Sequence, residues 1–517
     1  MAQKIKLKDI LLAVLTGFLL VLSFPKWDME EFAWVAFIPL FFAIENKNPL
    51  QAFYLGWVSG LIFFFGSLNW IISTIVTYGH ISWLTGLLAF LLMIFILASY
   101  PGIFSWGIRF CSNTIPIPKA ILNPILWTGL EFLRGHFFIP FPWDSLGYSQ
   151  YRHLWLIQFA DLTSVYGISF LIILINTVIF EVIFIFFYHG KLEKFPFVFS
   201  WVPIIAAFFL LIAILAYGKI RLVLPNNGKT VKVSVIQGNI DQNKKWDERY
   251  RNETLSNYET LSRKAAENHP DVILWPETSV PFLFEREREY RESLCQFVKS
   301  LHIPLLFGSP ALDKTPSGNE WFNSAYLINS DGILVDRYDK INLVPFGEYI
   351  PFQSILFFVN KLTEGIGDFK GGNRPTVFAL PEHPFGTLIC FEVIFPELFR
   401  KFVNQGAVFM TTITNDAWFG DTSAPYQHLS MVVFRAVENR TPIARAANTG
   451  ISGFIDSRGN VLATTSLFVP DQITVDLKYY EERTFYTQYG DIFGWSVLSA
   501  CILLIGFALM KRKNDVG

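Results

Sequence analysis

Charged residues and cysteine are both scarce in this sequence. Asp, Glu, Lys and Arg make up 16% of its 517 residues, whereas soluble domains carry about 25%. Its four cysteines include no Cys-x-x-Cys pair, so they indicate neither a redox motif nor a disulfide framework. The 42 basic and 43 acidic side chains nearly cancel, so no global positive charge indicates a nucleic-acid partner. These shortages exclude a wholly soluble protein and a disulfide-stabilised scaffold.

Apolar residues are abundant instead, and they dominate the N-terminal part of the chain. Hydrophobic residues make up 52% of the sequence, which includes 53 Phe and has a mean hydropathy of +0.37. Only 22 charged residues lie within 1–220, against 63 within 221–517. A membrane-spanning helix needs about 20 apolar residues. Candidate spans lie near 9–25, 30–45, 51–76, 82–108, 119–135, 157–188, 197–217 and 491–510.

The distribution of Lys and Arg in the short loops predicts the orientation of these spans. With eight spans and a cytoplasmic N-terminus, the basic residues near both termini fall on the inner side, including Lys511-Arg512-Lys513. We therefore expect a multi-pass bacterial inner-membrane protein whose two termini are cytoplasmic. The expected parts are a membrane domain with about seven helices at 1–222, a periplasmic catalytic domain at 223–487, and a C-terminal helix with a basic tail at 488–517.

Short strands alternate with polar helices in the expected periplasmic domain. A strand at 231–236, a helix at 247–268 and a strand at 271–275 begin this series, and such alternation predicts a layered α/β domain. Asp331-Gly332 lies between two strands and indicates a hairpin. Residues 351–375 fit no element, and their apolar stretch suggests a lid that faces the membrane.

Three residues with reactive side chains follow predicted strands. Glu277 lies in an apolar setting, which raises a carboxyl pKa and suits a general base. Lys340 is a cation that can stabilise an oxyanion. Cys390 ends a strand and precedes a helix, a placement that exposes a nucleophile and favours its thiolate. Each residue taken alone is more often not catalytic, because Glu and Lys are usually solvated on the surface and Cys is usually buried in the core. Together they supply a nucleophile, a base and an oxyanion stabiliser.

These segments resemble the Glu-Lys-Cys triad of the nitrilase superfamily, which acts on an α-β-β-α sandwich. The resemblance rests on Trp275-Pro276-Glu277, on Asp339-Lys340 with Pro345-Phe346-Gly347-Glu348, and on Cys390-Phe391-Glu392. A nitrilase-like domain between seven membrane helices and one further helix resembles the apolipoprotein N-acyltransferase family in particular. Further matching segments are Val235–Asn239 through Trp246, Thr414–Phe419 and Arg445–Ser452. Phe391 stands where that family often has Tyr.

The resemblance implies an acyltransferase reaction with two half-reactions. A fatty acyl chain would pass from a phospholipid, typically phosphatidylethanolamine, through a thioester on Cys390 to the N-terminal amine of S-diacylglyceryl-cysteine in a lipoprotein. Glu277 would be the base and Lys340 the oxyanion stabiliser. Glu348 would support the site, and Glu392 would orient Lys340 or the thiol. The expected substrate-binding residues are Trp246, Phe391, Trp418 and Phe419.

Two other functions share these motifs. One is a membrane-anchored nitrilase-type amidase that acts on a small amide, and the other is a transporter or sensor with an inactive nitrilase-like domain. The eight His residues never fall at metal-ligand spacing, so we expect neither a metal nor a cofactor. We also expect no nucleic-acid partner and a monomeric protein.

Overall fold

The computed structural model describes residues 4–79, 81–188, 197–224, 228–316, 318–351 and 369–516. The chain divides into two compact units. The first unit comprises Met1–Ser73, Ser82–Leu224 and Asp491–Gly517, and the second comprises Thr74–Ile81 and Pro225–Gly490.

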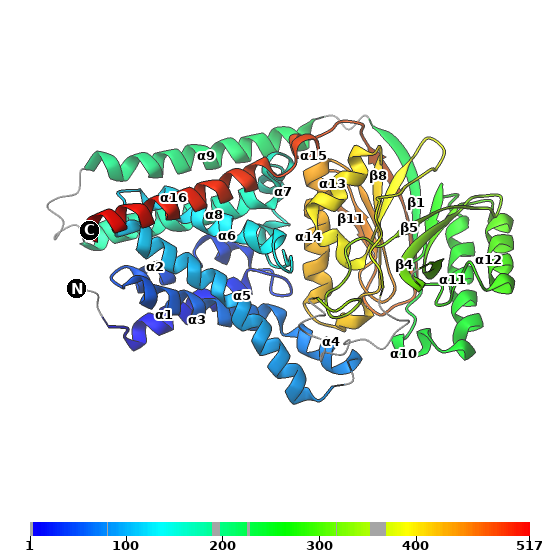
Figure 1. Cartoon of the computed structure of the whole chain (residues 1–517). Coiled ribbons are helices and arrows are strands. Elements are labelled where there is room, and N and C mark those ends of the chain that lie inside the picture. Colours follow the sequence, from blue (N-terminus) through cyan, green and yellow to red (C-terminus); the bar gives the residue numbers. More distant parts are fainter. Residues whose placement is uncertain are drawn as a thin grey trace. The chain divides into compact units, whose positions relative to one another are not determined.

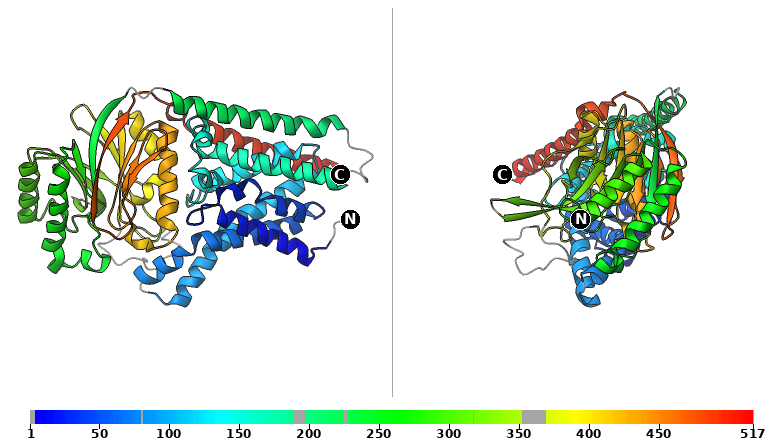
Figure 2. Two further views of the ribbon diagram at one scale, coloured as in Figure 1. Left: turned by 180° about the vertical axis from the view of Figure 1, so that it is seen from behind. Right: turned by 90° about the vertical axis from the view of Figure 1, so that its right-hand side faces the viewer.

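Helices make up the regular structure described for the first unit, and several of them run side by side (Figure 2). The contact between α3 and α5 depends on a glycine, because a Cβ at Gly56 would collide with the carbonyl oxygen of Pro101. Small residues of this kind allow membrane helices to approach closely. The helices are α1 (Leu7–Leu22), η1 (Glu30–Trp34), α2 (Ile38–Ile44), α3 (Pro49–Leu68), α4 (Trp70–Tyr78, which extends into the second unit), α5 (Trp83–Ser112), α6 (Lys119–His136), η2 (Leu146–Gln150), α7 (Leu154–Ile157), α8 (Ala160–Tyr188), α9 (Phe197–Val223) and α16 (Ile492–Val516).

Five helices in the described part of the chain are long and apolar enough to cross a membrane: α3, α5, α8, α9 and α16. The chain is therefore a polytopic membrane protein. The other expected spans form shorter or more polar helices. The stretch 30–45 divides into η1 and α2, with Pro39 in the first turn of α2, because proline can begin a helix but lacks the N–H needed to continue one. The stretch 51–76 likewise divides into α3 and α4.

Two six-stranded sheets form the centre of the second unit, and helices cover their outer faces (Figure 1). Helices α11 (Arg251–Ala266) and α12 (Arg288–Leu301) flank the first sheet, and α13 (Pro396–Asn404) and α14 (Ala424–Asn439) flank the second. This is the expected α-β-β-α sandwich. The first sheet has the order β12 (Asp471–Tyr479), β1 (Lys229–Gln237), β2 (Val272–Leu274), β3 (Leu305–Thr315), β4 (Gly318–Ile328), β5 (Leu334–Asp339). The second has the order β11 (Val461–Thr464), β10 (Gly453–Ile455), β9 (Ile443–Ala447), β8 (Phe409–Thr414), β7 (Phe385–Ile389), β6 (Val377–Phe378).

The strand directions bring the three predicted catalytic residues to one edge of the sandwich. Strands β2 and β3 are parallel, and β4 is antiparallel to both β3 and β5. Therefore β5 runs in the same direction as β2. Strands β7, β8 and β9 are also parallel. The carboxyl ends of parallel strands share one edge, where the sites of α/β proteins form. Glu277, Lys340 and Cys390 follow β2, β5 and β7, respectively.

Most of the strands and helices expected for the second unit are present. The hairpin at Asp331-Gly332 joins β4 to β5, and Gly332 adopts the positive φ of 79° that favours glycine in such a turn. The sequence pattern does not predict β12 or the short helix α10 (Gln242–Lys245). Of the loop expected to form a lid, residues 352–368 lie outside the described part of the chain.

Trp275 packs α11 against the first sheet, immediately before the segment that carries Glu277. Its side chain is fully buried, and its ring stacks on Tyr258 with a centroid distance of 5.0 Å. The indole N–H donates a hydrogen bond of 2.8 Å to Ser262 on α11. The position of the segment that leads to Glu277 therefore depends on the packing of this one aromatic side chain.

We expect Trp275→Ala to lower the free energy of unfolding of the second unit by about 3–5 kcal/mol, the usual result of removing a buried aromatic ring. Hydrogen–deuterium exchange of peptides from β2 and α11, in the detergent-solubilised full chain, measures this change. The matched control is Trp246→Ala, because Trp246 is 40% exposed, and surface changes usually stay within about 0.5 kcal/mol. Equal protection in the two variants would contradict the prediction.

Candidate active site

Cys390 lies at a sharp turn between a strand and a helix. Strand β7 ends at Ile389, and Cys390 begins the 3-10 helix η5 (Cys390–Ile394). The backbone of Cys390 is in the left-handed region, with a φ of 53°, and Cys390 is 8% exposed. A non-glycine residue in this conformation is strained, and strained strand-to-helix turns of this kind hold the nucleophile in α/β-hydrolases.

The carboxylate of Glu277 is held by donors from both sheets. One oxygen accepts a 2.8 Å hydrogen bond from the side-chain amide of Asn323 on β4. The other accepts a 2.9 Å bond from the backbone N–H of Asn415, which follows β8. Because the residue is only 6% exposed, these bonds fix the orientation of the carboxylate.

The backbone of Glu277 is fixed by close contact with β3. Pro276 O accepts a hydrogen bond from the N–H of Gly308, whose own carbonyl accepts from Val280 N–H. A Cβ at position 308 would lie 2.8 Å from Glu277 Cα. Glycine is therefore required at this position on β3 for the Glu277 segment to lie where it does.

Lys340 is a buried cation between two carboxylates. Its ammonium nitrogen lies 3.1 and 3.0 Å from the two oxygens of Glu348, and 3.7 Å from Glu277 Oε1. Burial alone would lower the pKa of Lys340, but Glu348 and Glu277 raise it above its ordinary value. Glu348 also accepts hydrogen bonds from Asn323 and from Val344 N–H. Lys340 therefore stays charged, as an oxyanion stabiliser must.

The surroundings of Cys390 favour its neutral thiol over the thiolate. Burial raises its pKa well above the usual range, and the Glu277 carboxylate raises it further, while Lys340 opposes this effect. A neutral thiol is a weak nucleophile that needs a base. The carboxylate of Glu277 interacts with the thiol, so Glu277 is a candidate for this base.

Glu392 ties together the segments that carry Lys340 and Cys390. It is completely buried and accepts hydrogen bonds from Tyr338 Oη and Ile341 N–H at 2.7 Å, from Asn342 N–H at 3.1 Å and from Ile389 N–H at 2.8 Å. Burial raises its pKa to about 7. Its hydrogen bonds thus hold the main chain on either side of the candidate catalytic groups.

Four further polar residues around the site are not among the predicted site residues, although Lys245, Asp416 and Arg445 lie in segments on which the family resemblance rests. Asn323 bridges Glu277 and Glu348, as described above. Lys245, on α10, is 2% exposed and donates a 3.0 Å hydrogen bond to the backbone carbonyl of Glu277. Asp416, directly after Asn415, pairs with Arg445 at 2.6 Å, and burial of both keeps this pair away from water. Asn323 and Lys245 resemble ordinary surface residues in sequence, and only strand pairing and loop packing bring them to the site.

Of the four aromatic residues expected to bind substrate, three follow β7 or β8 and one follows the helix α10. Trp246 comes directly after α10 and is 40% exposed. Phe391 is half-buried, and its ring lies edge-on to Phe395 at 5.2 Å. Trp418 and Phe419 end the 3-10 helix η6 (Asp416–Phe419) and are half-buried.

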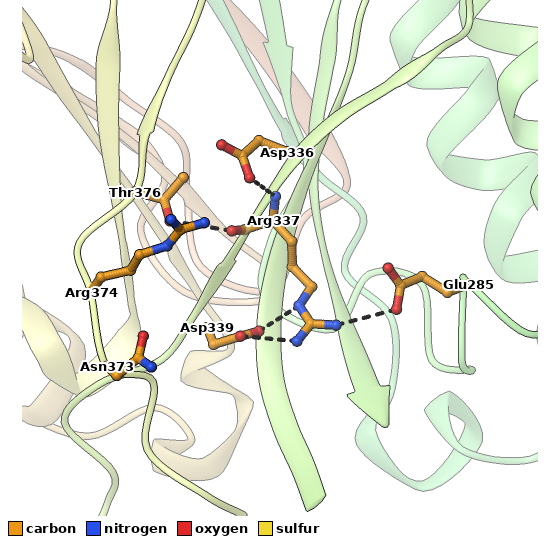
Figure 3. A pocket seen from close by; sticks show the side chains of 7 residues that line it. All are labelled: Glu285, Asp336, Arg337, Asp339, Asn373, Arg374 and Thr376. Carbon is orange, nitrogen blue, oxygen red and sulfur yellow. Dashed lines mark hydrogen bonds and ion pairs between the residues drawn. The ribbon is translucent and has the colours of Figure 1, made fainter. Parts of the chain in front are cut away.

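A cavity of about 300 Å³ lies beside β5 and is lined by charged and polar groups (Figure 3). Arg337 points toward Asp339 and Glu285 there, at 2.9 and 3.2 Å. Successive residues of a strand point to opposite faces, so Asp339 turns away from the side on which Lys340 lies. This polar lining does not suit an acyl chain. The lining residues are Glu285, Asp336, Arg337, Asp339, Asn373, Arg374 and Thr376.

The fold and the buried Glu-Lys-Cys arrangement define a membrane protein with a nitrilase-like unit. Residues 232–483 match the family model described as carbon-nitrogen hydrolase, and residues 16–178 match that of the apolipoprotein N-acyltransferase N-terminal domain. An "Apolipoprotein N-acyltransferase" of Geobacter metallireducens is 43% identical over 98% of this chain and 96% of its own. An enzyme of the same name from Pasteurella multocida is 30% identical over 99% of this chain and 98% of the relative's chain. The chain therefore belongs to the apolipoprotein N-acyltransferase family, a family of enzymes.

Solved structures with a similar fold include an amidase from Nesterenkonia sp. AN1. The match to this amidase covers 50% of the present chain and 96% of the amidase chain, with 20% sequence identity and a TM-score of 0.38.

We expect Asn323→Asp to destabilise the protein in a pH-dependent manner. The new carboxylate would lie between Glu277 and Glu348, and this repulsion raises its pKa above the unfolded value. A raised carboxyl pKa leaves folding little affected at low pH and lowers stability as the pH rises above the unfolded pKa. The thermal unfolding midpoint should therefore fall by several degrees more at pH 8 than at pH 5. For a chain of this size, each kcal/mol of lost stability lowers the midpoint by about 4 °C or less.

Asn329→Asp is the matched control for this substitution. Asn329 follows the same strand, and its side-chain oxygen accepts hydrogen bonds from the N–H groups of Asp331 and Ile333. A carboxylate can accept both bonds, so this variant should unfold as wild type does at both pH values. A pH-independent loss of stability in Asn323→Asp would show that charge repulsion is not the cause.

Proposed function

We propose that this enzyme transfers a fatty acyl chain from a phospholipid to the N-terminal amine of a diacylglyceryl-modified lipoprotein. The donor is a glycerophospholipid, with phosphatidylethanolamine as the expected head group. The convergence of Glu277, Lys340 and Cys390 at one sheet edge, in a chain with membrane-spanning helices, carries this proposal. The family to which the chain belongs supports a lipoprotein as the acceptor.

In the first half-reaction the thiol of Cys390 attacks the ester carbonyl carbon of the phospholipid. Glu277 accepts the thiol proton as the sulfur–carbon bond forms, and the carbonyl electrons move onto oxygen. Lys340 stabilises that oxyanion. When the tetrahedral intermediate collapses, the ester carbon–oxygen bond breaks, and protonated Glu277 returns its proton to the departing lysophospholipid oxygen. A thioester remains on the enzyme.

In the second half-reaction the free α-amine of the lipoprotein attacks the thioester carbon. Glu277 now accepts a proton from the amine, and Lys340 again stabilises the oxyanion. The carbon–sulfur bond breaks, the amide forms, and the thiolate of Cys390 recovers its proton from Glu277. Glu348 and Glu392 support the site by holding Lys340 and the adjoining main chain.

The physical properties of the substrates favour an enzyme that is itself embedded in the membrane. Removing an acyl chain from the bilayer costs about 0.8 kcal/mol per CH₂ group, so a soluble enzyme would have to overcome a large barrier for each substrate. A site without free access of water also protects the thioester from hydrolysis. We assign contacts with the lipid chains to the four aromatic residues described above: Trp246, Phe391, Trp418 and Phe419.

We further propose that the catalytic domain, at 223–487, lies in the periplasm and that both termini are cytoplasmic. The membrane domain would occupy 1–222, and a last helix with a basic tail would occupy 488–517. The bias of Lys and Arg toward the inner loops supports this orientation.

A nitrilase-type amidase that acts on a small amide would use the same three residues. The likeness to N-acyltransferases over 98% of the chain, membrane helices included, favours lipid acyl transfer. An inactive domain is disfavoured because the buried charges at the site remain mutually compensated.

We expect wild-type protein incubated with a phospholipid of defined acyl chains, and with no amine acceptor, to gain the mass of one acyl group. Intact-protein mass spectrometry measures this gain, and hydroxylamine should remove it. Cys390→Ala should gain nothing. Glu277→Gln should form the adduct about 10²–10⁴-fold more slowly, the usual contribution of a general base.

Cys295→Ala is the matched control, because Cys295 is a half-buried thiol on α12 of the same unit. It should acylate as wild type does. If folded wild-type protein forms no adduct but hydrolyses a small amide, the amidase function is correct instead.

The orientation is tested by single cysteines in a background without the four native ones. Asp331→Cys lies in the exposed turn between β4 and β5, and Lys513→Cys is exposed near the C-terminus. A membrane-impermeant maleimide added to intact spheroplasts should label position 331 and leave position 513 unlabelled until the cells are lysed. Labelling in the reverse order would contradict the proposed orientation.

A further inference from the structure

The short helix α10 holds the proposed base, Glu277, at two points. Lys245 Nζ donates a 3.0 Å hydrogen bond to the backbone carbonyl of Glu277. Gln242 accepts a 2.7 Å bond from the side-chain amide of Asn415, whose backbone N–H binds the Glu277 carboxylate at 2.9 Å. One side chain of α10 thus contacts the base directly, and another contacts it through Asn415.

Lys245 is buried, unlike its neighbour on the same helix. It is 2% exposed, whereas Lys244 is exposed and lies over the ring of Tyr250. An ammonium group has three donors, and within the described part of the chain the structure gives that of Lys245 one acceptor. Burying such a charge is costly unless other charges compensate it. A single neutral carbonyl does not provide that compensation.

The compensating charges are those of the proposed catalytic site. Burial lowers the pKa of Lys245 to about 8, and the carboxylate of Glu277 and, when it is ionised, the thiolate of Cys390 act in the opposite direction. The electrostatic field of Lys245 therefore reaches the sulfur as well as the base. The other titratable or charged groups near Cys390 are Lys340, Glu348, Glu392, Asp416, His428 and Arg445.

A charge balance shows what Lys245 adds to the site. Glu277 and Glu348 carry two negative charges, and Lys340 supplies one positive charge within 4 Å of both. Asp416 is neutralised by Arg445. Without Lys245 the buried set has an excess negative charge, which opposes formation of a thiolate. A protonated Lys245 offsets the excess charge of the group formed by Glu277, Glu348 and Lys340, and it adds to Lys340 a second cation that interacts with the new thiolate.

We propose that Lys245 is a positioning residue that holds the main chain of Glu277 and supplies a second positive charge that stabilises the Cys390 thiolate. This inference rests on the proposed role of Cys390 as the nucleophile. In this proposal Lys340 stabilises the oxyanion, and Lys245 stabilises the thiolate of Cys390. The position next to Trp246 also links this charge to a residue that we assign to substrate contact.

The test measures the reactivity of the thiol without any acyl donor. Full-length protein in detergent is treated with iodoacetamide between pH 6 and pH 10, and peptide mass spectrometry follows Cys390 separately from Cys111, Cys295 and Cys501. Lys245→Met should alkylate at Cys390 about tenfold more slowly at pH 8, the effect of one unit of thiol pKa. Its rate–pH profile should shift to higher pH by about the same amount.

Two further variants separate charge from hydrogen bonding. Lys245→Gln can still donate to the Glu277 carbonyl but has no charge, so it should react as slowly as Lys245→Met. Lys245→Arg keeps the charge and should stay within about threefold of wild type, well below the tenfold effect of one pKa unit. Lys244→Met, on the same helix, should match wild type. If Lys245→Met does not fold, the Gln and Arg variants make the same comparison.

The outcome that overturns the proposal is a Gln variant that reacts like wild type, because Lys245 would then serve only as a hydrogen-bond donor. Unchanged reactivity in both Gln and Met variants would overturn it as well. This test is independent of the acyl-enzyme measurement. A charge-dependent alkylation rate together with no phospholipid adduct would uphold the role of Lys245 and reject phospholipid as the donor.

Discussion

The buried ammonium of Lys340, with Glu348 on one side and Glu277 on the other, is the constraint around which the second unit is organised. Charges that are taken out of water are stable only when partners and hydrogen bonds compensate them. Lys340 lies 3.0 Å from Glu348 and 3.7 Å from Glu277, and Asn323 donates to both carboxylates. These contacts require the segments that follow β2 and β5 to meet the middle of β4 within a few ångströms. The same arrangement leaves a buried positive charge beside Glu277, where we propose that it stabilises the oxyanion.

The second sheet completes the site by main-chain contacts across the sandwich. Asn415 N–H binds the Glu277 carboxylate, and Glu392 binds main-chain N–H groups on both sides of the sheet interface. A shift of one sheet relative to the other would therefore break hydrogen bonds of Glu277 and of the main chain that follows Lys340. We infer that the rigidity of the sandwich, more than any single loop, holds the proposed triad in place. Such preorganisation is what electrostatic stabilisation of a transition state needs.

Sequence reasoning located the residues that end strands and missed those that reach the site from elsewhere. Glu277, Lys340 and Cys390 follow strands whose apolar pattern is visible in the sequence, and parallel strands bring their carboxyl ends together. Asn323 lies inside β4, and Lys245 lies on a four-residue helix with no hydrophobic periodicity. Nothing local distinguishes a buried lysine from a solvated one. The stretch 30–45 shows the same limit, because its hydropathy suggested a span although a new short helix begins there at Ile38, with Pro39 in its first turn.

The amino-acid sequence by itself indicated that the protein lies in a membrane, that a layered α/β domain follows the first group of helices, and that a thiol, a carboxylate and an amine after its strands are candidate catalytic groups. These properties follow from composition, periodicity and the ends of strands, all of which are local. The tertiary structure alone decided which carboxylate binds which cation, that Asn323 joins the two acids, and that Lys245 lies beside Glu277. Lys340 and Glu348 are 8 positions apart, and the contacts of Asn323, Lys245 and Asn415 join residues that are 25 to 138 positions apart in the chain. Their geometry depends on how two sheets pair and pack, and local patterns in the sequence carry no information about that.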